Sequence, residues 1–180
     1  MNHSKQAIRS DLLQKILQLH PQRKEEASKA ACSFLLEQFK TNDTKVLSFA
    51  SKPFELNLWP LNTWLAEQNR LVLPKVENGA LNIYEVSQWS QLKLSSLGIQ
   101  EPNSSLCKKV KPEETSLIIL VPALCFDENL HRIGHGKGHY DQFLLSALKS
   151  QKWGIGFKEQ QYTLLPVEPH DLAMDDVFLF

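Results

Sequence analysis

The chain has 180 residues, and its 20 Lys plus Arg balance its 20 Asp plus Glu, so it carries no formal net charge. This length predicts a single domain over residues 1–180 with enough material for a sizeable core. A general polyanion binder would carry a basic excess, so we expect no nucleic-acid partner. One local basic cluster, at residues 108–111, is more typical of a solvated loop.

Three cysteines, Cys32, Cys107 and Cys125, are far apart in the sequence and favour reduced thiols over a disulfide framework. The N-terminal stretch MNHSKQAIRSDLLQK is charged and lacks a continuous apolar core, so we expect no signal peptide. No apolar run approaches the roughly 18 residues that a membrane span requires. We therefore expect a cytoplasmic protein with no membrane partner, and we expect a monomer.

Two helices are predicted at the start of the chain. Residues 4–19 carry apolar side chains at helical spacing, and Pro21–Phe39 begins with a proline suited to a first helical turn. Lys5 and Arg9 are four residues apart and therefore share one helical face. On spacing alone, that pair is most simply a solvated face.

Strands and shorter helices alternate along the remainder. Strands are predicted at Lys45–Ala50, Arg70–Leu73, Leu81–Val86, Leu117–Leu124, Trp153–Phe157 and Val177–Phe180. Helices are predicted at Leu61–Gln68 and Tyr140–Lys149. Pro74 is expected to close the second strand, and Ser87–Glu114 to be an irregular flap or surface connection.

This alternation predicts an α/β fold of Rossmann-like type, with a mainly parallel central sheet flanked by helices in three layers. Ligands bind at the carboxyl ends of strands in such sheets. The segment after the first strand holds Glu55, and Asp171 follows a later strand. We therefore expect both to meet a glycine-rich loop at one edge of the sheet.

That loop lies within His131–Phe143, HRIGHGKGHYDQF, and follows the most apolar run of the chain. Its three alternate glycines let a ligand approach the main chain, and Arg132 and Lys137 supply positive charge. A helix start at Tyr140 would favour an anion, so the segment indicates a phosphate site. It matches neither a P-loop nor a dinucleotide fingerprint, and a simple turn is the alternative.

A zinc site is a further alternative, because His131, His135 and His139 are spaced by four residues, like ligands on one helical face. The interspersed glycines each cost about 1 kcal/mol in a helix, which argues against a regular helix here.

Further motifs recur in order along nearly the whole chain. Pro122–Asp127 and Arg132–Asp141 match P-G-x-x-F-D-x-x-G-x-R-L-G-x-G-[GK]-G-Y-Y-D. Elements of the form K-x-x-x-R, E-x-x-T, G-I-x-E-P, F-x-x-Q, L-P and H-D stand, in turn, at Lys5–Arg9, Glu55–Leu58, Gly98–Pro102, Phe157–Gln160, Leu165–Pro166 and His170–Asp171. Together they resemble the 5-formyltetrahydrofolate cyclo-ligase family, also called 5,10-methenyltetrahydrofolate synthetases.

The resemblance implies an ATP- and Mg²⁺-dependent enzyme that converts 5-formyltetrahydrofolate to 5,10-methenyltetrahydrofolate and releases ADP and phosphate. It implies that the formyl oxygen attacks the γ-phosphorus to give an N5-iminium phosphate, and that N10 then closes the ring. A different ATP-dependent small-molecule kinase or ligase, or a catalytically silent folate- or nucleotide-binding module, is the alternative.

The resemblance also implies roles for particular residues. Lys137 and Arg132 are the implied catalytic residues, and Asp141 and Asp171 the implied Mg²⁺ ligands. Implied ATP contacts are Lys5, Gln6, Ala7, Ile8, Arg9, Arg132, Ile133, Gly134, His135, Gly136, Lys137, Gly138, His139 and Tyr140. Implied folate contacts are Ala50, Glu55, His135, Gly136, Lys137, Gly138 and His139. Considered alone, Asp141 is also a common helix-capping residue and Asp171 an ordinary surface acid.

The chain departs from the family pattern at several positions. Leu58 replaces a threonine, which questions one polar contact near the folate, and His139 replaces a tyrosine. Ala123, Gln142 and Leu117 are further departures. The candidates to stack on the pteridine are Phe49, Phe54 and Trp59, although core packing is the commoner fate of such residues.

Overall fold

The computed structural model describes residues 4–95, 98–168 and 171–180. Within them, the order of the largest sheet is β12-β10-β7-β1-β2-β3-β6. Pairing is parallel from β12 through β2 and antiparallel from β2 to β6. The strands are β1 (Lys45–Leu47), β2 (Leu71–Glu77), β3 (Ala80–Glu85), β6 (Lys109–Val110), β7 (Leu117–Pro122), β10 (Gln151–Gly156) and β12 (Asp176–Leu179). The prediction of an α/β fold with a mainly parallel sheet is confirmed.

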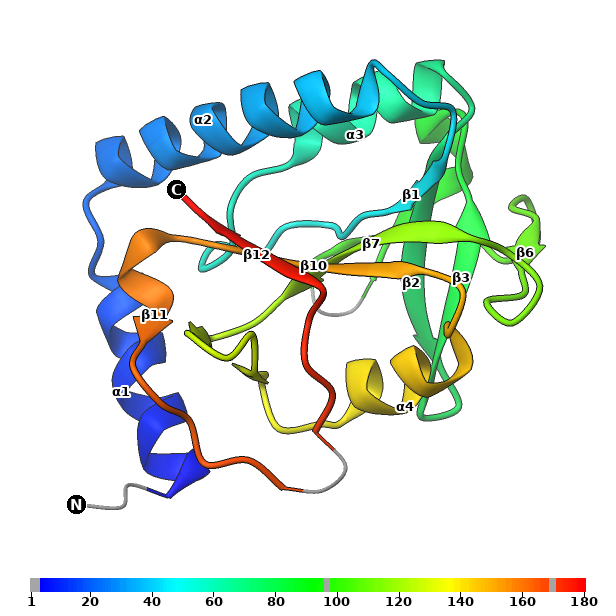
Figure 1. Cartoon of the computed structure of the whole chain (residues 1–180). Coiled ribbons are helices and arrows are strands. Elements are labelled where there is room, and N and C mark those ends of the chain that lie inside the picture. The colour runs from blue at the N-terminus through cyan, green and yellow to red at the C-terminus, as the bar shows by residue number, and fades with distance from the viewer. Residues whose placement is uncertain (1–3, 96–97, 169–170) are drawn as a thin grey trace.

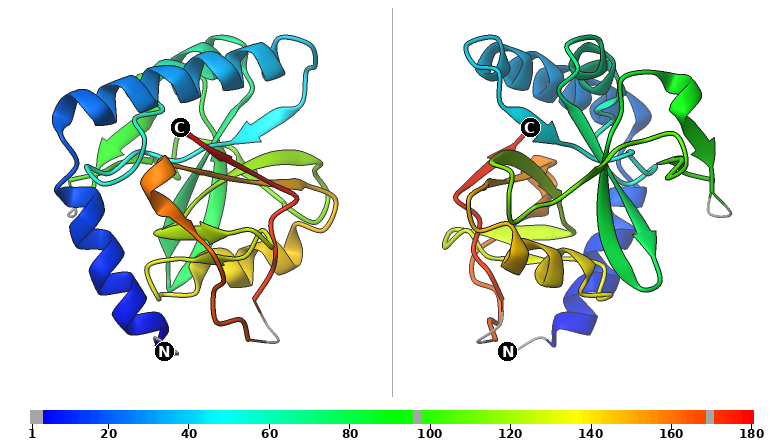
Figure 2. Two further views of the ribbon diagram at one scale, coloured as in Figure 1. Left: turned by 60° about the vertical axis from the view of Figure 1, so that its left-hand side comes forward. Right: turned by 90° about the vertical axis from the view of Figure 1, so that its right-hand side faces the viewer.

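Helices cover both faces of this sheet. α2 (Pro21–Phe39) and α3 (Trp59–Glu67) lie on one face, and α4 (His139–Ser146) lies on the other (Figures 1 and 2). Each side has its own apolar core, with Leu35 on the first and Phe143 on the second. These are the three layers that the alternating pattern predicts.

A smaller sheet, in the order β11-β8-β9, lies beside α1 (Lys5–Leu17). Its strands are β8 (Cys125–Asp127), β9 (Arg132–Ile133) and β11 (Gln161–Tyr162). Ile8 and Leu12 of α1 pack against Ile133 of β9 in a third apolar cluster. This packing fixes α1 next to the segment that leads into the glycine loop. The sequence did not predict this arrangement, because the strands of the smaller sheet are too short to show a pattern.

Asp127 organises the turn between β8 and β9. Its Oδ1 accepts hydrogen bonds from the backbone N–H groups of Asn129 (3.0 Å) and His131 (2.9 Å), and its Oδ2 from that of Leu165 (3.0 Å). Leu130 stands where the family signature has glycine, and its φ is +64°. A left-handed leucine costs roughly 1–2 kcal/mol, so the bonds of Asp127 hold a strained turn in place.

Most expected strand boundaries differ from the structure by one or two residues, and two differ by more. The first strand ends at Leu47 instead of Ala50, which leaves Phe49 and Ala50 outside the ladder. β2 continues through Pro74 to Glu77 because β3 pairs with it there. Ser48 N–H donates to the carbonyl of Val72, so the backbone N of Pro74, two residues on, faces the side where β1 has already ended. The missing N–H of Pro74 therefore removes no ladder bond.

The stretch from Ser87 to Glu114 is more ordered than the sequence suggests. It holds the short helix η1 (Trp89–Gln91), the paired strands β4 (Leu92–Leu94) and β5 (Gln100–Pro102), and β6. Strands of two or three residues with polar side chains give no periodic signal, so the pattern could not show them.

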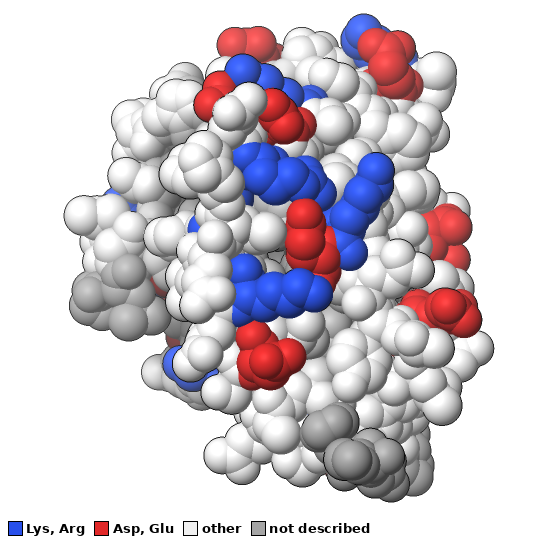
Figure 3. Space-filling model, turned by 90° about the vertical axis from the view of Figure 1, so that its left-hand side faces the viewer, with Lys and Arg blue, Asp and Glu red and all other residues white. Residues whose placement is uncertain are grey.

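Charged side chains of both signs are interleaved on the surface. Figure 3 shows this on the face formed by α1, the start of α2 and the short helix η2 (Lys158–Gln160), where Arg23 and Glu159 pair at 2.9 Å. In the basic cluster, Lys108 lies 3.6 Å from Glu85 and Lys111 lies 2.7 Å from Glu114. Among the described residues, no helix is both long and apolar enough to cross a membrane.

Candidate active site

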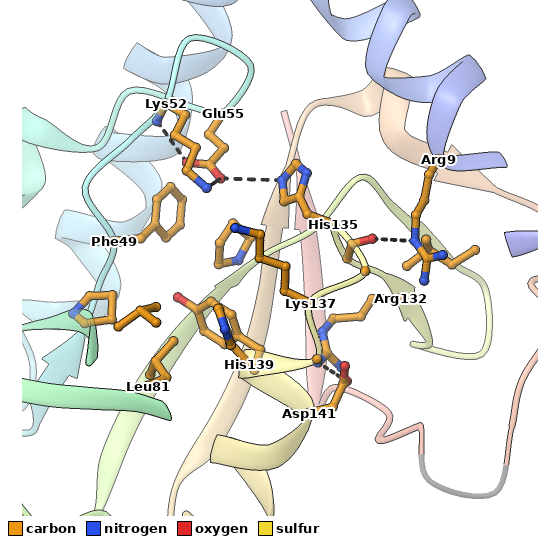
Figure 4. A pocket seen from close by; sticks show the side chains of 18 of the residues that line it. Arg9, Phe49, Lys52, Glu55, Leu81, Arg132, His135, Lys137, His139 and Asp141 are labelled. Carbon is orange, nitrogen blue, oxygen red and sulfur yellow. Dashed lines mark hydrogen bonds and ion pairs between the residues drawn. The ribbon is translucent and has the colours of Figure 1, made fainter. Parts of the chain in front are cut away.

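A cavity of about 880 Å³ lies at the carboxyl ends of β1, β2 and β7 (Figure 4). Its lining comes from segments that are far apart in the sequence: the start of α1, the loop after β1, the hairpin of β2 and β3, and the glycine loop. Glu55 and Asp171 both line it. The expected convergence of these residues with the glycine loop at one sheet edge is therefore confirmed.

The glycine loop, residues 134–138, joins β9 to α4 and is fastened to α1. Arg9 Nε–H donates to the carbonyl of Gly134 at 3.0 Å. Gly136 has φ +88°, and a Cβ there would lie 3.5 Å from the Arg9 guanidinium. Gly138, at φ +68°, is the residue that precedes the first turn of α4. The Lys5 and Arg9 face of α1 therefore faces the loop instead of bulk solvent.

One side of the cavity is held together by ion pairs; we call it the ion-pair wall, consisting of Lys5, Arg9, Arg132, Asp141 and Asp171. Lys5 Nζ lies 2.6 Å from Asp171 Oδ2. Arg132 is almost fully buried and donates from Nη2 to Asp141 Oδ1 and from Nη1 to the carbonyl of Leu172. Every residue of this wall thus has a charged or carbonyl partner within the protein.

The opposite side carries polar groups with few partners, of which the Glu55 side chain and the Tyr140 hydroxyl are buried; we call it the Glu55 wall, consisting of Phe49, Phe54, Glu55, His135 and Tyr140. Glu55 Oε2 accepts a hydrogen bond from the backbone N–H of Lys52 at 2.9 Å. Its Oε1 lies 3.9 Å from both Lys52 Nζ and His135 Nε2. Burial raises the pKa of Glu55, and the charge of Lys52 only partly opposes that shift.

His135 is the member of the Glu55 wall that comes from the glycine loop. Its ring centroid is 5.0 Å from that of Phe54, and Figure 4 shows the ring turned toward Glu55. Burial, and then the charges of Lys52 and Arg9, lower the pKa of His135 to about 4. The imidazole is therefore neutral near pH 7 and can donate one hydrogen bond and accept another.

Tyr140 adds an unsatisfied donor to the Glu55 wall. Its hydroxyl is buried and has no hydrogen-bond partner among the described residues. Burial, and then the nearby negative charge of Glu55, raise the pKa of Tyr140. Buried polar groups without partners are uncommon in folded proteins and suggest a place that a ligand completes.

The structure places most of the predicted site residues around the cavity. Lys5, Gln6, Arg9, Ala50, Glu55, Asp171 and residues 132–141 all line it. Ala7 and Ile8 are not part of the lining, and Ile8 packs in the core beneath α1. Lys137 is exposed, and Figure 4 shows its side chain extending into the cavity toward Phe49.

Several lining residues were missed in the sequence. They are Ser4, Lys52, Pro74, Lys75, Val76, Leu81, Ser95, Ile99, Gln100, Glu101, Pro122 and Glu168. Among them, only Ile99–Glu101 and Pro122 belong to motifs that the sequence shows, the G-I-x-E-P element and the signature that begins at Pro122. Residues 74–76 and Leu81 reach the cavity through the pairing of β2 with β3, and Lys52, Ser95 and Glu168 reach it from segments outside the strands; local patterns encode neither.

Other motif residues turn out to support the fold. Gln160 is 2% exposed; its side chain donates to the carbonyl of Ala123 and accepts from the N–H of Phe157 at 2.6 Å, which ties the end of β10 to the bend between β7 and β8. Leu58 is fully buried in the core and does not line the cavity. Its replacement of threonine therefore enlarges apolar packing instead of altering the cavity surface.

The aromatic candidates have different surroundings. Phe49 is 4% exposed and lines the cavity, and Phe54 packs against His135. Trp59 pairs with Trp89 at 5.3 Å, outside the cavity lining.

The histidine spacing does not assemble a zinc site. His131 Nδ1 lies 3.6 Å from Asp127, whereas His135 lies beside Glu55. The described residues contain no group of three His, Cys, Asp or Glu side chains arranged to hold a metal ion.

The fold and the cavity define a class of protein. A glycine loop and a helix start, surrounded by cations at the carboxyl edge of a parallel sheet, are typical of α/β enzymes that use a phosphorylated ligand.

Comparison with known proteins narrows this class to one family. Residues 1–179 match the model of the 5-formyltetrahydrofolate cyclo-ligase family. A 5-formyltetrahydrofolate cyclo-ligase of Mycolicibacterium smegmatis is 31% identical over 186 aligned residues, which cover 97% of this chain and 92% of the relative. A probable cyclo-ligase of Schizosaccharomyces pombe is 34% identical over 91 residues, which cover 49% of this chain and 43% of that protein.

A solved structure agrees with the sequence comparisons. The NMR structure of Aquifex aeolicus 5,10-methenyltetrahydrofolate synthetase superimposes with a TM-score of 0.84 at 31% identity, covering 96% of this chain and 88% of that chain. The chain belongs to the 5-formyltetrahydrofolate cyclo-ligase family. It is an ATP-dependent ligase of folate one-carbon metabolism with 5-formyltetrahydrofolate cyclo-ligase activity.

Proposed function

We propose that the cavity binds ATP and 5-formyltetrahydrofolate together and that ring closure proceeds through an N5-iminium phosphate. The formyl oxygen attacks the γ-phosphorus and ADP leaves. N10 then attacks the activated formyl carbon, and phosphate leaves as 5,10-methenyltetrahydrofolate forms. The observation that carries this proposal is one cavity lined by the glycine loop, three cations of the ion-pair wall and the buried Glu55.

The triphosphate is assigned to the ion-pair wall and the glycine loop. Transfer of a phosphoryl group depends on fixed positive charge near the charge that develops in the transition state. Lys5 and Arg9 line the cavity from α1, and Lys137 extends into it from the loop. Lys137 acts on the transferring phosphate, and Arg132, which pairs with Asp141 in the ligand-free protein, contacts the phosphates from the base of the loop.

Mg²⁺ is assigned to the same wall. The ion prefers oxygen ligands and commonly takes one or two carboxylates together with phosphate oxygens and water. Asp141 and Asp171 supply carboxylates on the cavity surface, so the donor set fits. When bound, the ion would neutralise charge on the phosphates, while the two aspartates hold it beside the loop.

The folate is assigned to the Glu55 wall. The pteridine ring carries N–H donors that suit a buried carboxylate, and the contacts of Glu55 Oε1 with Lys52 Nζ and His135 Nε2 are 3.9 Å long, too long for hydrogen bonds. Phe49 and Ala50 border the same space. The neutral His135 then separates the pteridine from the phosphates.

One assay tests the proposal. Purified chain is mixed with 5-formyltetrahydrofolate, Mg²⁺ and ATP, and formation of the methenyl product is followed by its ultraviolet absorbance, with ADP measured in parallel. Matched yields of both products, lost when Mg²⁺ is chelated, are expected. ADP without the methenyl product would instead identify a small-molecule kinase, and folate binding without either product a silent module.

The proposal also includes a single cyclo-ligase domain over residues 1–180, a monomer and a cytoplasmic location. Size-exclusion chromatography with light scattering tests the monomer, and limited proteolysis tests whether the chain behaves as one unit.

A further inference from the structure

The ion-pair wall brings together residues with opposite expected partners. Lys5 and Arg132 are assigned to phosphate, whereas Asp171 and Asp141 are assigned to Mg²⁺. In the structure these four residues bind one another: Lys5 pairs with Asp171 at 2.6 Å, and Arg132 pairs with Asp141. Two of the proposed phosphate ligands, Lys5 and Arg132, are therefore each paired with a proposed metal ligand.

The Lys5 pair is tight and well shielded. The Lys5 side chain is 18% exposed and that of Asp171 is 16% exposed. Asp171 Oδ2 also accepts the backbone N–H of Glu168 at 2.7 Å, which holds the carboxylate toward Lys5. A second carboxylate, Glu168 Oε2, lies 3.3 Å from Lys5 Nζ but is 53% exposed. Since charges screened from water interact more strongly, Asp171 is the dominant partner of Lys5.

This pairing changes what ATP meets in the absence of a metal. Lys5 with Asp171 and Glu168 carries a net charge of −1, and Arg132 with Asp141 is neutral, so the wall offers the triphosphate little net attraction beyond Arg9 and Lys137. Asp171 and Asp141 release their cations when they become metal ligands, and those cations are then available to phosphate.

We propose that the Lys5–Asp171 and Arg132–Asp141 ion pairs are exchanged for phosphate and metal contacts when Mg²⁺ and ATP bind, which makes the binding of ATP and Mg²⁺ cooperative. The inference rests on the proposed assignment of ATP and Mg²⁺ to this wall. It adds that Asp171 and Asp141 suppress ATP binding in the absence of metal, a property that metal ligation alone does not require.

Calorimetric titration of the full chain with ATP tests the exchange, first in EDTA and then at saturating Mg²⁺. Asp171→Asn keeps the shape of the side chain but removes its charge, which releases Lys5. It is expected to bind ATP in EDTA roughly five- to tenfold more tightly than the wild type, the size of typical coupling between sites, and to gain less from Mg²⁺.

Glu168→Gln is the matched control, because it removes an equal charge that also contacts Lys5. Its Kd for ATP in EDTA is expected to change by less than about twofold, as for an exposed ion pair. An equal gain in both variants would show only general repulsion and would overturn the exchange. So would an unchanged Kd in folded Asp171→Asn.

A second pair of variants tests the mechanism of the gain. In a Lys5→Met background, Asp171→Asn is expected to give no further gain in EDTA, because there is no lysine to release. A gain that persists without Lys5 would contradict the exchange. Should Asp171→Asn not fold, Asp141→Asn applies the same test to the Arg132 pair. Methenyl formation by the wild type is measured separately, so failure of the exchange and failure of the proposed function are distinguishable.

Discussion

The two walls of the cavity differ in how their polar side chains are paired. On the ion-pair wall, Lys5, Arg132, Asp141 and Asp171 satisfy one another within the protein. On the Glu55 wall, the Tyr140 hydroxyl is buried without a hydrogen-bond partner among the described residues, and the contacts of Glu55 Oε1 with Lys52 Nζ and His135 Nε2 are 3.9 Å long. The first wall is complete without ligand, whereas the second is left to be completed by one.

This difference matches the ligands assigned to each wall. ATP with Mg²⁺ brings charges of both signs and can replace internal ion pairs with external ones. The folate ring brings neutral hydrogen-bond donors and acceptors. Their hydrogen bonds stabilise the complex most when they are made to protein groups that have no partner in the free protein. The raised pKa of Glu55 and the lowered pKa of His135 both show that burial disfavours the charged forms of these two side chains before substrate binds.

The largest effect is expected at Lys137, the loop cation that extends into the cavity (Figure 4). Lys137→Ala removes positive charge next to the transferring phosphate, so kcat is expected to fall by roughly 100-fold or more. Steady-state kinetics of methenyl formation measure this. Lys149→Ala, on the exposed segment after α4, is the control. Unchanged kcat and ATP KM in Lys137→Ala would remove Lys137 from the chemistry.

The next effect separates the walls directly. Glu55→Gln removes a charged acceptor for the pteridine, and the folate KM is expected to rise by about tenfold, in line with the loss of one charge-assisted hydrogen bond. The KM for ATP should stay close to that of the wild type, because Glu55 belongs to the opposite wall. If the KM for ATP changed instead, the assignment of ATP to the ion-pair wall and of the folate to the Glu55 wall would have to be reversed.

A smaller effect concerns stability at acid pH. The pKa of His135 is lowered from 6.5 to about 4 in the folded protein. The unfolded chain therefore takes up a proton first, and stability is lost as pH falls from about 6.5 toward 4. His135→Gln removes this loss; after solvent screening we expect about 1 kcal/mol, or a few degrees in Tm at pH 5.

Glu55 titrates with the opposite sign and must be separated from His135. Its raised pKa favours the protonated folded state, so its contribution to stability is present below the unfolded value near 4.5 and is lost as pH rises through the raised pKa. Thermal unfolding of both single variants between pH 4 and 8 separates the two groups. An acid-side loss that remains in His135→Gln would assign it to another residue.

The extent to which sequence predicts this site depends on the kind of information each residue carries. The unbroken apolar run of β7 is local and predicted a buried strand, and the helical spacing of Lys5 and Arg9 predicted a shared face. Whether that face was solvated depended on β9, a two-residue strand packed under α1 that has no pattern of its own. Only the family resemblance supplied that link in advance.

The paired state of the ion-pair wall was beyond sequence reasoning. The resemblance assigned Lys5 to ATP and Asp171 to Mg²⁺, but the contact between them joins residues 166 positions apart. Lys75 and Leu81 likewise reach the cavity only because β2 runs through Pro74 and pairs with β3. Long-range register, not residue type, decides such contacts.

The smallest effect tests whether the Glu55 wall is truly unsatisfied. Tyr140→Phe deletes a buried hydroxyl that has no partner among the described residues, so the free energy of unfolding of the ligand-free protein should stay the same or rise, by less than about 1 kcal/mol. Tyr84→Phe is the matched control, since Tyr84 is also buried but donates to Glu77, and it should destabilise the protein by about 1–2 kcal/mol. Denaturant unfolding compares the two. Equal losses would mean that the Tyr140 hydroxyl is already satisfied in the free protein, and the contrast between the walls would then rest on Glu55 alone.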